Sequence, residues 1–263
     1  MQQNYGFYTI YSMKELIHYR ATIFVESPIG YTKDNVDMFP LKDWKCMPLT
    51  NDANTQAINP FEIISKTKDF DGAEWKAINL EKGFSIVFWG TKIDILGQPF
   101  VDEHSFVQMS KQIFEQICAS YSIKKVACFA YSPTYGEKNG DISGIIKHPF
   151  YKGAEAENVT ARSVYRVDEV INDKNVKINY LIEISSGMFV DQEKQTPSVI
   201  YDVDINSTVI DDVIFSTSDM SAFFDKAESF ANEFAGPACE IQLLNEISRF
   251  APAEVIENLE MYE

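Results

Sequence analysis

One stretch in the first half of the chain changes its hydrophobic period twice, which constrains the fold more than any other feature of the sequence. Residues 84–95 alternate between large apolar side chains and their neighbours around a Gly-Thr pair, which is typical of a two-residue β-hairpin. Apolar side chains then recur every three or four residues from 106 to 121, which predicts an amphipathic helix with Asp102 or Ser105 as N-cap. Residues 125–131 form a nearly continuous apolar run, which indicates a strand buried on both faces. A sheet with a helix across it is the expected product.

Weaker signals precede this stretch. Residues 7–11 alternate as a strand does, and residues 21–25 predict another strand. Between them, Ser12 and Glu15 have the spacing of a capping box, which predicts helical turns as far as Tyr19. The N-terminal part is therefore expected to add a short helix and two strands.

Residues 26–82 show no regular period, and prolines recur among their polar residues and turn formers. The segment nevertheless carries more aromatic side chains than a free linker retains, namely Phe39, Trp44, Phe61, Phe70 and Trp75. A long loop with such a composition either packs onto a sheet or holds a partner. Trp44 and Trp75 are therefore candidate partner-binding residues, with packing as the alternative role.

The second half of the chain repeats the same ingredients in a different order. Residues 158–168 and 176–186 predict a hairpin, and residues 198–205 predict a further strand with an apolar and a polar face. Residues 218–236 carry an apolar stripe at helical spacing that ends at Gly-Pro.

We therefore predict an α+β fold of largely antiparallel sheets, each covered by an amphipathic helix. The repeated ingredients allow an arrangement of two similar halves. The N-terminal half is expected to span residues 1–150, including the irregular segment 26–82, and the C-terminal half residues 151–263.

Acidic residues mark the end of the chain. Apolar spacing after Glu240 predicts one helix there, and residues 253–262 predict a second, short one. If this last segment is helical, carboxylates at three-residue spacing form a slowly drifting stripe on it, made up of Glu254, Glu257, Glu260 and Glu263. These four residues are candidate contacts to a basic partner.

Composition favours an ordinary globular protein of the cytoplasm. Apolar residues make up 45% of the chain, and no stretch resembles a secretion signal or a membrane-spanning helix. The four cysteines are far apart, form no Cys-x-x-Cys pair and mostly lie among apolar residues, which predicts buried free thiols: Cys46, Cys118, Cys128 and Cys239.

The net charge of −16 argues against a nucleic-acid backbone or an anionic membrane as a direct partner, because both repel an acidic protein. The charge is also uneven. From Pro197 to Glu263 fourteen Asp and Glu residues stand against only Lys226 and Arg249, so −12 of the −16 lies in the last quarter. Such asymmetry indicates an interaction surface, although acidity that serves only solubility is the alternative.

Catalytic signatures are sparse. The three histidines share no metal-ligand spacing, and the chain has no nucleophile elbow. Asp202 and Asp204 point to one face of a predicted strand, and Glu183 would lie opposite Asp202 if the neighbouring strand pairs antiparallel, which is how some sites hold Mg²⁺. The competing interpretation is ion pairing on a solvated sheet face, with Arg162, Arg166 and Lys177 as the cations. We expect no cofactor and no essential metal.

Several short segments resemble a sporadically distributed bacterial family of uncharacterised proteins of similar length. The resemblance rests on Gly83-Phe84 at the start of the hairpin, the run from Phe129 to Pro133, and Asp202-Val203-Asp204 before an amphipathic helix. It implies a fold with two α+β halves and implies no activity.

The function favoured by these features is that of a non-enzymatic interaction protein, a subunit or regulator that docks an acidic surface on a basic partner or associates with itself. The alternative is a metal-dependent nuclease or nucleotidyltransferase that uses Asp202, Asp204 and Glu183. A further alternative is a nucleic-acid mimic that occupies the cleft of a DNA-binding enzyme.

Overall fold

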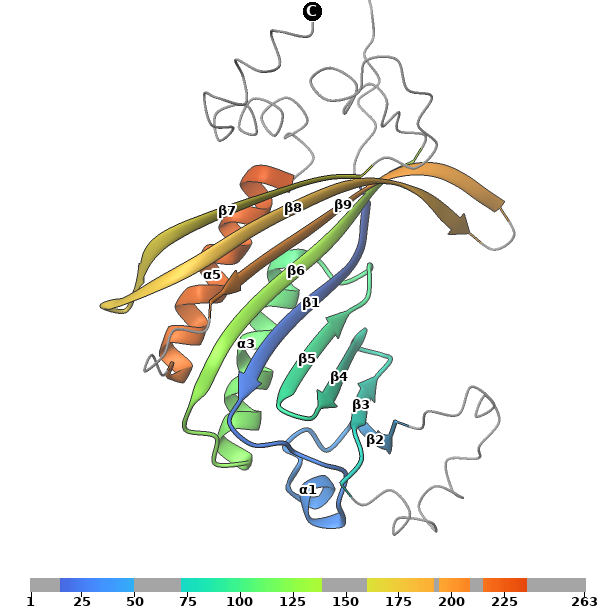
Figure 1. The fold of residues 1–263 in the computed structure, drawn as a ribbon. Coiled ribbons are helices and arrows are strands. Elements are labelled where there is room, and N and C mark those ends of the chain that lie inside the picture. The colour runs from blue at the N-terminus through green and yellow to red at the C-terminus, as the bar shows by residue number, and fades with distance from the viewer. Residues whose placement is uncertain (1–14, 50–71, 139–159, 192–193, 209–214, 236–263) are drawn as a thin grey trace, which may run out of the picture.

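The structure is a computed structural model, and it describes residues 15–49, 72–138, 160–191, 194–208 and 215–235. The nine strands of the described residues form one antiparallel sheet, in the spatial order β2-β3-β4-β5-β1-β6-β9-β8-β7 (Figure 1). The elements of the described residues are β1 (Glu15–Val25), α1 (Lys33–Met38), β2 (Lys45–Pro48), β3 (Trp75–Asn79), β4 (Phe84–Trp89), β5 (Lys92–Gly97), α3 (Glu103–Ser120), β6 (Val126–Lys138), β7 (Thr160–Ile171), β8 (Lys174–Asp191), β9 (Lys194–Ser207) and α5 (Thr217–Ala235).

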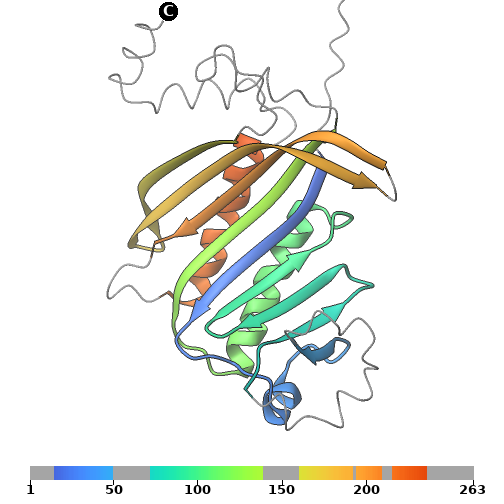
Figure 2. The same ribbon diagram turned by 45° about the vertical axis from the view of Figure 1, so that its right-hand side comes forward.

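The two long helices lie side by side on one face of the sheet, as both views show (Figures 1 and 2). They run antiparallel, because Phe114 in the second half of α3 stacks on Phe224 of α5 at 5.8 Å, whereas His104 near the start of α3 reaches Glu228, one turn further along α5. None of the helices in the described ranges is long and apolar enough to cross a membrane.

Aromatic rings fill the layer between the helices and the sheet. Phe129 of β6 lies 4.7 Å from Phe215 and 5.4 Å from Phe223, measured between ring centroids, and all three side chains are buried. In the same layer, nearer to β4, Phe106 of α3 stacks on Tyr19 of β1 at 5.0 Å and on Phe84 of β4 at 5.6 Å. Fully burying one such ring contributes about 1.5 to 3 kcal/mol, so these contacts hold the helices to the sheet.

The predicted fold class is wrong: the described strands form a single large antiparallel sheet, not one sheet beneath each helix. The reason lies in the two central strands. β1 pairs with β5 on one side and with β6 on the other, and β6 pairs with β9, so hydrogen bonds run without interruption from the first half to the second. Both helices then cover the same face of that shared sheet, and the strands dominate the fold.

The order of strands nevertheless has an internal two-fold arrangement. β1 is followed in the chain by α1 and β2, then by the meander β3-β4-β5 and α3, and β6 is followed by the meander β7-β8-β9 and then α5. In space β5 lies beside β1 and β9 lies beside β6, with β1 and β6 at the centre. The regions expected as 1–150 and 151–263 both contribute strands to this one sheet.

The helix predicted from the capping box is also wrong within the described residues, because Glu15 to Tyr19 belong to β1. Glu15 pairs with Gly136 and Leu16 with Tyr135, so sheet pairing outweighs the weak local helix signal. The strand predicted at 7–11, the helix predicted after Glu240 and the one predicted at 253–262 lie outside the described residues.

Candidate functional site

The sheet face opposite α3 and α5, here called the outer face, carries the acidic residues of the predicted metal site. Glu183 of β8 lies directly opposite Asp202 of β9, and Arg162 of β7 lies opposite Glu183. This confirms the register expected from the polar faces of the strands. Lys177 lies opposite Asp168 instead, further along the same two strands.

Hydrogen bonds link the polar side chains of the outer face across several strands. Asp202 accepts from the hydroxyl of Thr134 at 2.7 Å, and Asp204 accepts from the hydroxyl of Ser132 at 2.9 Å and from the amide of Asn206 at 3.1 Å. Ser132 in turn accepts from Arg20 of β1 at 3.3 Å.

The same network continues towards β7. Asn206 accepts from the amide of Asn179 at 2.9 Å, and Asn179 accepts from Nε of Arg166 at 2.6 Å. The chain of contacts therefore spans β1, β6, β9, β8 and β7. Satisfied polar ladders of this kind fix the register of neighbouring strands.

Nothing in the described residues assembles three metal-ligating side chains from His, Cys, Asp and Glu around one point. Asp202 and Asp204 direct one oxygen each to a hydroxyl of β6. What this arrangement does chemically is hold strands together through neutral hydroxyl and amide donors. Arg166, one of the cations expected to balance these carboxylates, donates to Asn179, so the ion-pairing interpretation stays a prediction.

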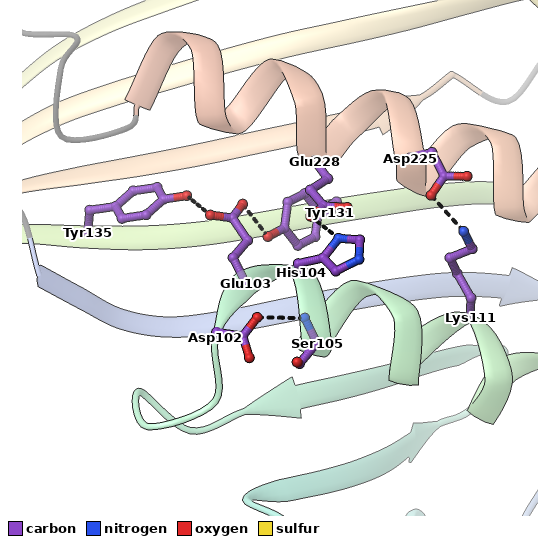
Figure 3. A network of polar contacts seen from close by, with 9 residues as sticks. All are labelled: Asp102, Glu103, His104, Ser105, Lys111, Tyr131, Tyr135, Asp225 and Glu228. Atoms are coloured by element: carbon purple, nitrogen blue, oxygen red, sulfur yellow. Dashed lines mark hydrogen bonds and ion pairs between the residues drawn. The ribbon is translucent and has the colours of Figure 1, made fainter.

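A second polar cluster, here called the Glu103 cluster, lies between the start of α3, the sheet and α5 (Figure 3). Its centre is the carboxylate of Glu103, which accepts from the phenol of Tyr131 at 2.7 Å and from that of Tyr135 at 2.8 Å. Beside it, Nδ1 of His104 lies 2.9 Å from Oε1 of Glu228 on α5.

The local sequence determines where the residues of the Glu103 cluster lie. Asp102 caps α3 by accepting from the backbone N–H of Ser105 at 2.9 Å, so Glu103 occupies the first turn and is held over β6. Tyr131 and Tyr135 are four residues apart on a strand, which puts both on the helix-covered face. That shared parity is the sequence signal of this cluster, and it was not among the predicted site features.

Burial sets the electrostatics of the cluster. It raises the pKa of Glu103 above its ordinary value, although the two phenol hydrogen bonds act in the opposite direction. Burial raises the pKa of Tyr131 and Tyr135 as well, and the nearby Glu103 carboxylate adds to the effect. The cluster is thus a carboxyl group that holds a proton more readily than usual, beside phenols that remain hydrogen-bond donors.

The two candidate tryptophans of the irregular segment are both buried. Trp75 has an exposed fraction of 0% and stacks on Phe88 at 4.0 Å, while its indole N–H donates to the carbonyl of Ile29 at 2.8 Å. Trp44 is 8% exposed and packs edge-on against Phe39. Of the two roles that the sequence leaves open for these residues, their burial fits the packing role.

Trp44 also borders a cavity of about 640 Å³ beside α1, which is lined by Tyr31, Thr32, Lys33, Val36, Asp37, Phe39, Leu41, Lys42, Trp44 and Cys46. Burial raises the pKa of the Cys46 thiol to about 11, which leaves it almost fully protonated at neutral pH. A protonated thiol is a poor nucleophile and a poor metal ligand, so the cavity is not lined by a reactive cysteine.

The other described cysteines are inert for the same reason. Cys118 and Cys128 are buried free thiols, and burial raises the pKa of both. This confirms the prediction for these two, whereas Cys46 is only half-buried. Cys239 and the candidate partner contacts Glu254, Glu257, Glu260 and Glu263 lie outside the described residues.

No protein-family model matches this chain, and no curated protein matches it. The resemblance to a sporadically distributed bacterial family therefore stays a prediction.

Proposed function

We propose that the protein acts by binding, as a non-enzymatic subunit or regulator that docks an acidic surface on a basic partner protein. The observation that carries this proposal is the ion pair between Lys111 of α3 and Asp225 of α5, whose charged atoms are 2.6 Å apart. The side chain of Asp225 is 54% exposed and that of Lys111 only 12%. The negative member of the pair therefore faces solvent and the positive member lies beneath it.

Further exposed carboxylates lie on the layer formed by α3 and α5, here called the helix layer. Asp102 and Glu115 of the α3 region are exposed, and Lys226 of α5 is turned towards Glu169 of β7, with which it forms an ion pair. The outward charge of the two helices is therefore carried mainly by carboxylates. An acidic surface of this kind accelerates the encounter with a basic partner and makes the rate depend on salt.

The sequence that follows α5 adds to this charge. The helix ends at Ala235, and the remaining residues contain six Glu and a single Arg. Together with the carboxylates of α5 they make up most of the charge of the last quarter. We therefore place the acidic surface on the helix layer and on the segment that continues from it.

The experiment begins with capture of a partner from a lysate of the source organism at low salt, followed by purification of that partner. Association rates of the pair are then measured by surface plasmon resonance over a range of salt concentrations. The double variant Glu115→Gln/Asp225→Asn is expected to associate at least about threefold more slowly at low salt, with a flatter salt dependence.

The matched control is Glu74→Gln/Glu81→Gln, which removes the same charge from exposed positions on either side of β3. If the control slows association as much as the helix variant does, the effect comes from net charge and the proposed surface is wrong. A third variant, with Gln at Glu254, Glu257, Glu260 and Glu263, tests the terminal segment by the same measurement.

A further inference from the structure

The strand β7 is the last strand of the sheet at one end. It pairs with β8 over its whole length, from Thr160 to Ile171, and no described strand pairs with its other edge. At the opposite end of the sheet the corresponding strand of the first meander, β3, is paired with β2 on its outer side. The second meander has no counterpart of β2 among the described residues, so β7 is where the internal two-fold arrangement leaves a strand unmatched.

Side chains on β7 have a self-complementary order. On the outer face every second residue reads Val164, Arg166, Asp168, Val170, and all four are exposed. Val164 is 54% exposed and Val170 is 61% exposed, which is high for apolar residues of a strand. Read in the opposite direction, the same four positions give apolar, negative, positive, apolar. Edge strands usually carry charge to prevent association, yet here the charges match a reversed copy of themselves.

We propose that β7 pairs antiparallel with β7 of a second copy of this chain, with Val167 of each copy opposite the other. In this register Val164 faces the partner's Val170 and Arg166 faces the partner's Asp168. The two-fold symmetry makes each contact occur twice. The two sheets then become continuous across the dimer, a known mode of association through a strand edge. This proposal goes beyond the proposed function, because the dimer requires no basic partner.

Other registers of the β7–β7 pair match charges and apolar side chains less well. A two-fold axis at Arg166 would place this residue opposite itself, and an axis at Asp168 would do the same for the carboxylate. Like charges directly opposite one another destabilise a strand pair. An axis at Tyr165 would place Val164 against the partner's Arg166. Only the axis at Val167 pairs apolar with apolar and positive with negative on the outer face.

Sedimentation velocity of the full chain between about 1 and 200 μM is the first measurement, because a single strand edge buries less surface than a standard interface and a micromolar dissociation constant is expected. Arg166→Asp and Asp168→Arg should each raise the dissociation constant by at least about tenfold, since each creates two pairs of like charges. The double variant Arg166→Asp/Asp168→Arg restores opposite charges and should dimerise like the wild type. Lys124→Asp, at an exposed position after α3, is the control with the same charge change as Arg166→Asp.

Cysteine pairing tests the register without altering any charge. Cα atoms directly opposite in an antiparallel pair are about 4.5 to 5.5 Å apart, which a disulfide spans. A mixture of the Val164→Cys and Val170→Cys variants should form a cross-linked dimer on mild oxidation, and neither variant should do so alone. A chain that stays monomeric at 200 μM, a dimer indifferent to both charge reversals, or a mixture that fails to cross-link would each overturn the proposal.

Discussion

Tyr131 donates its phenolic proton to Oε1 of Glu103 across 2.7 Å, which joins the centre of the sheet to the first turn of α3. The second oxygen of the same carboxylate accepts from Tyr135, so one acidic side chain holds two residues of β6 (Figure 3). Desolvation of that carboxylate makes the stability of the fold depend on pH in an unusual direction for an acid.

Glu103→Gln is expected to gain stability relative to the wild type as pH rises from about 4.5 towards 7. The pKa of Glu103 is raised in the folded protein, mainly by burial. A group with a raised pKa contributes stability below its unfolded pKa and loses that contribution as pH rises through the folded pKa. Urea unfolding of both proteins at several pH values measures the difference. A difference that stays constant with pH would contradict the prediction.

Asp219→Asn should show the opposite pH dependence. Burial acts to raise the pKa of Asp219, but hydrogen bonds from Lys174, Ser216 and Asn172 outweigh it and the pKa is lowered. Its contribution to stability is therefore present above the unfolded pKa and lost as pH falls through the folded pKa. The variant should be less stable than the wild type at pH 7, and the gap should close in acid. Thermal melts at pH 7 and near pH 3 are the measurement.

Phe129→Ala is expected to reduce the free energy of unfolding by about 3 to 5 kcal/mol, because the ring is fully buried among Phe215, Phe223 and Phe224. Phe100→Ala is the matched control, since that ring is 70% exposed and its loss should change the free energy by no more than about 0.5 kcal/mol. Chemical denaturation of the two variants side by side checks the placement of the core. Equal losses would mean that it is wrong.

Gly97→Ala should destabilise the protein by about 1 to 3 kcal/mol through overpacking. A Cβ at Gly97 would lie 2.4 Å from the buried ring of Phe106, which is confined by Tyr19 and Phe84. Gly90→Ala is the comparison: its φ of +55° strains an alanine, but the added Cβ meets open space. Melting temperatures should rank Gly97→Ala below Gly90→Ala, and the reverse order would show that backbone strain is the larger effect.

Local periodicity was enough to predict the elements that bury one face. The apolar stripe of α3 and the hairpin of β4 and β5 agree with the structure, and of the two N-cap candidates Asp102 is the one that caps the helix. The second hairpin agrees as well, with positive φ at both turn residues, Asn172 and Asp173. In each case the determining interactions lie within a few residues along the chain.

The order of the strands could not be predicted in this way. It depends on β1, whose residues pair with β5 at separations of about 70 to 80 residues and with β6 at separations above 100, as Arg20 does with Ser132. The Glu103 cluster was not predicted for the same reason. Glu103 lies 28 residues from Tyr131 and 32 from Tyr135 in the sequence, and the three form no motif. The outer face was predicted more fully, since strand parity alone brings Glu183 and Asp202 together.

The central position of β1 has a consequence for how the chain is made. On the ribosome, the strands of the first meander emerge soon after β1 and can pair with it through β5, but the other edge of β1 has to wait for β6. Until then a partly synthesised chain exposes one unpaired edge of β1, a strand with alternate apolar residues. Release of a truncated product that stops before β6 would leave this edge open permanently. Such fragments should aggregate far more readily than fragments that end after β6.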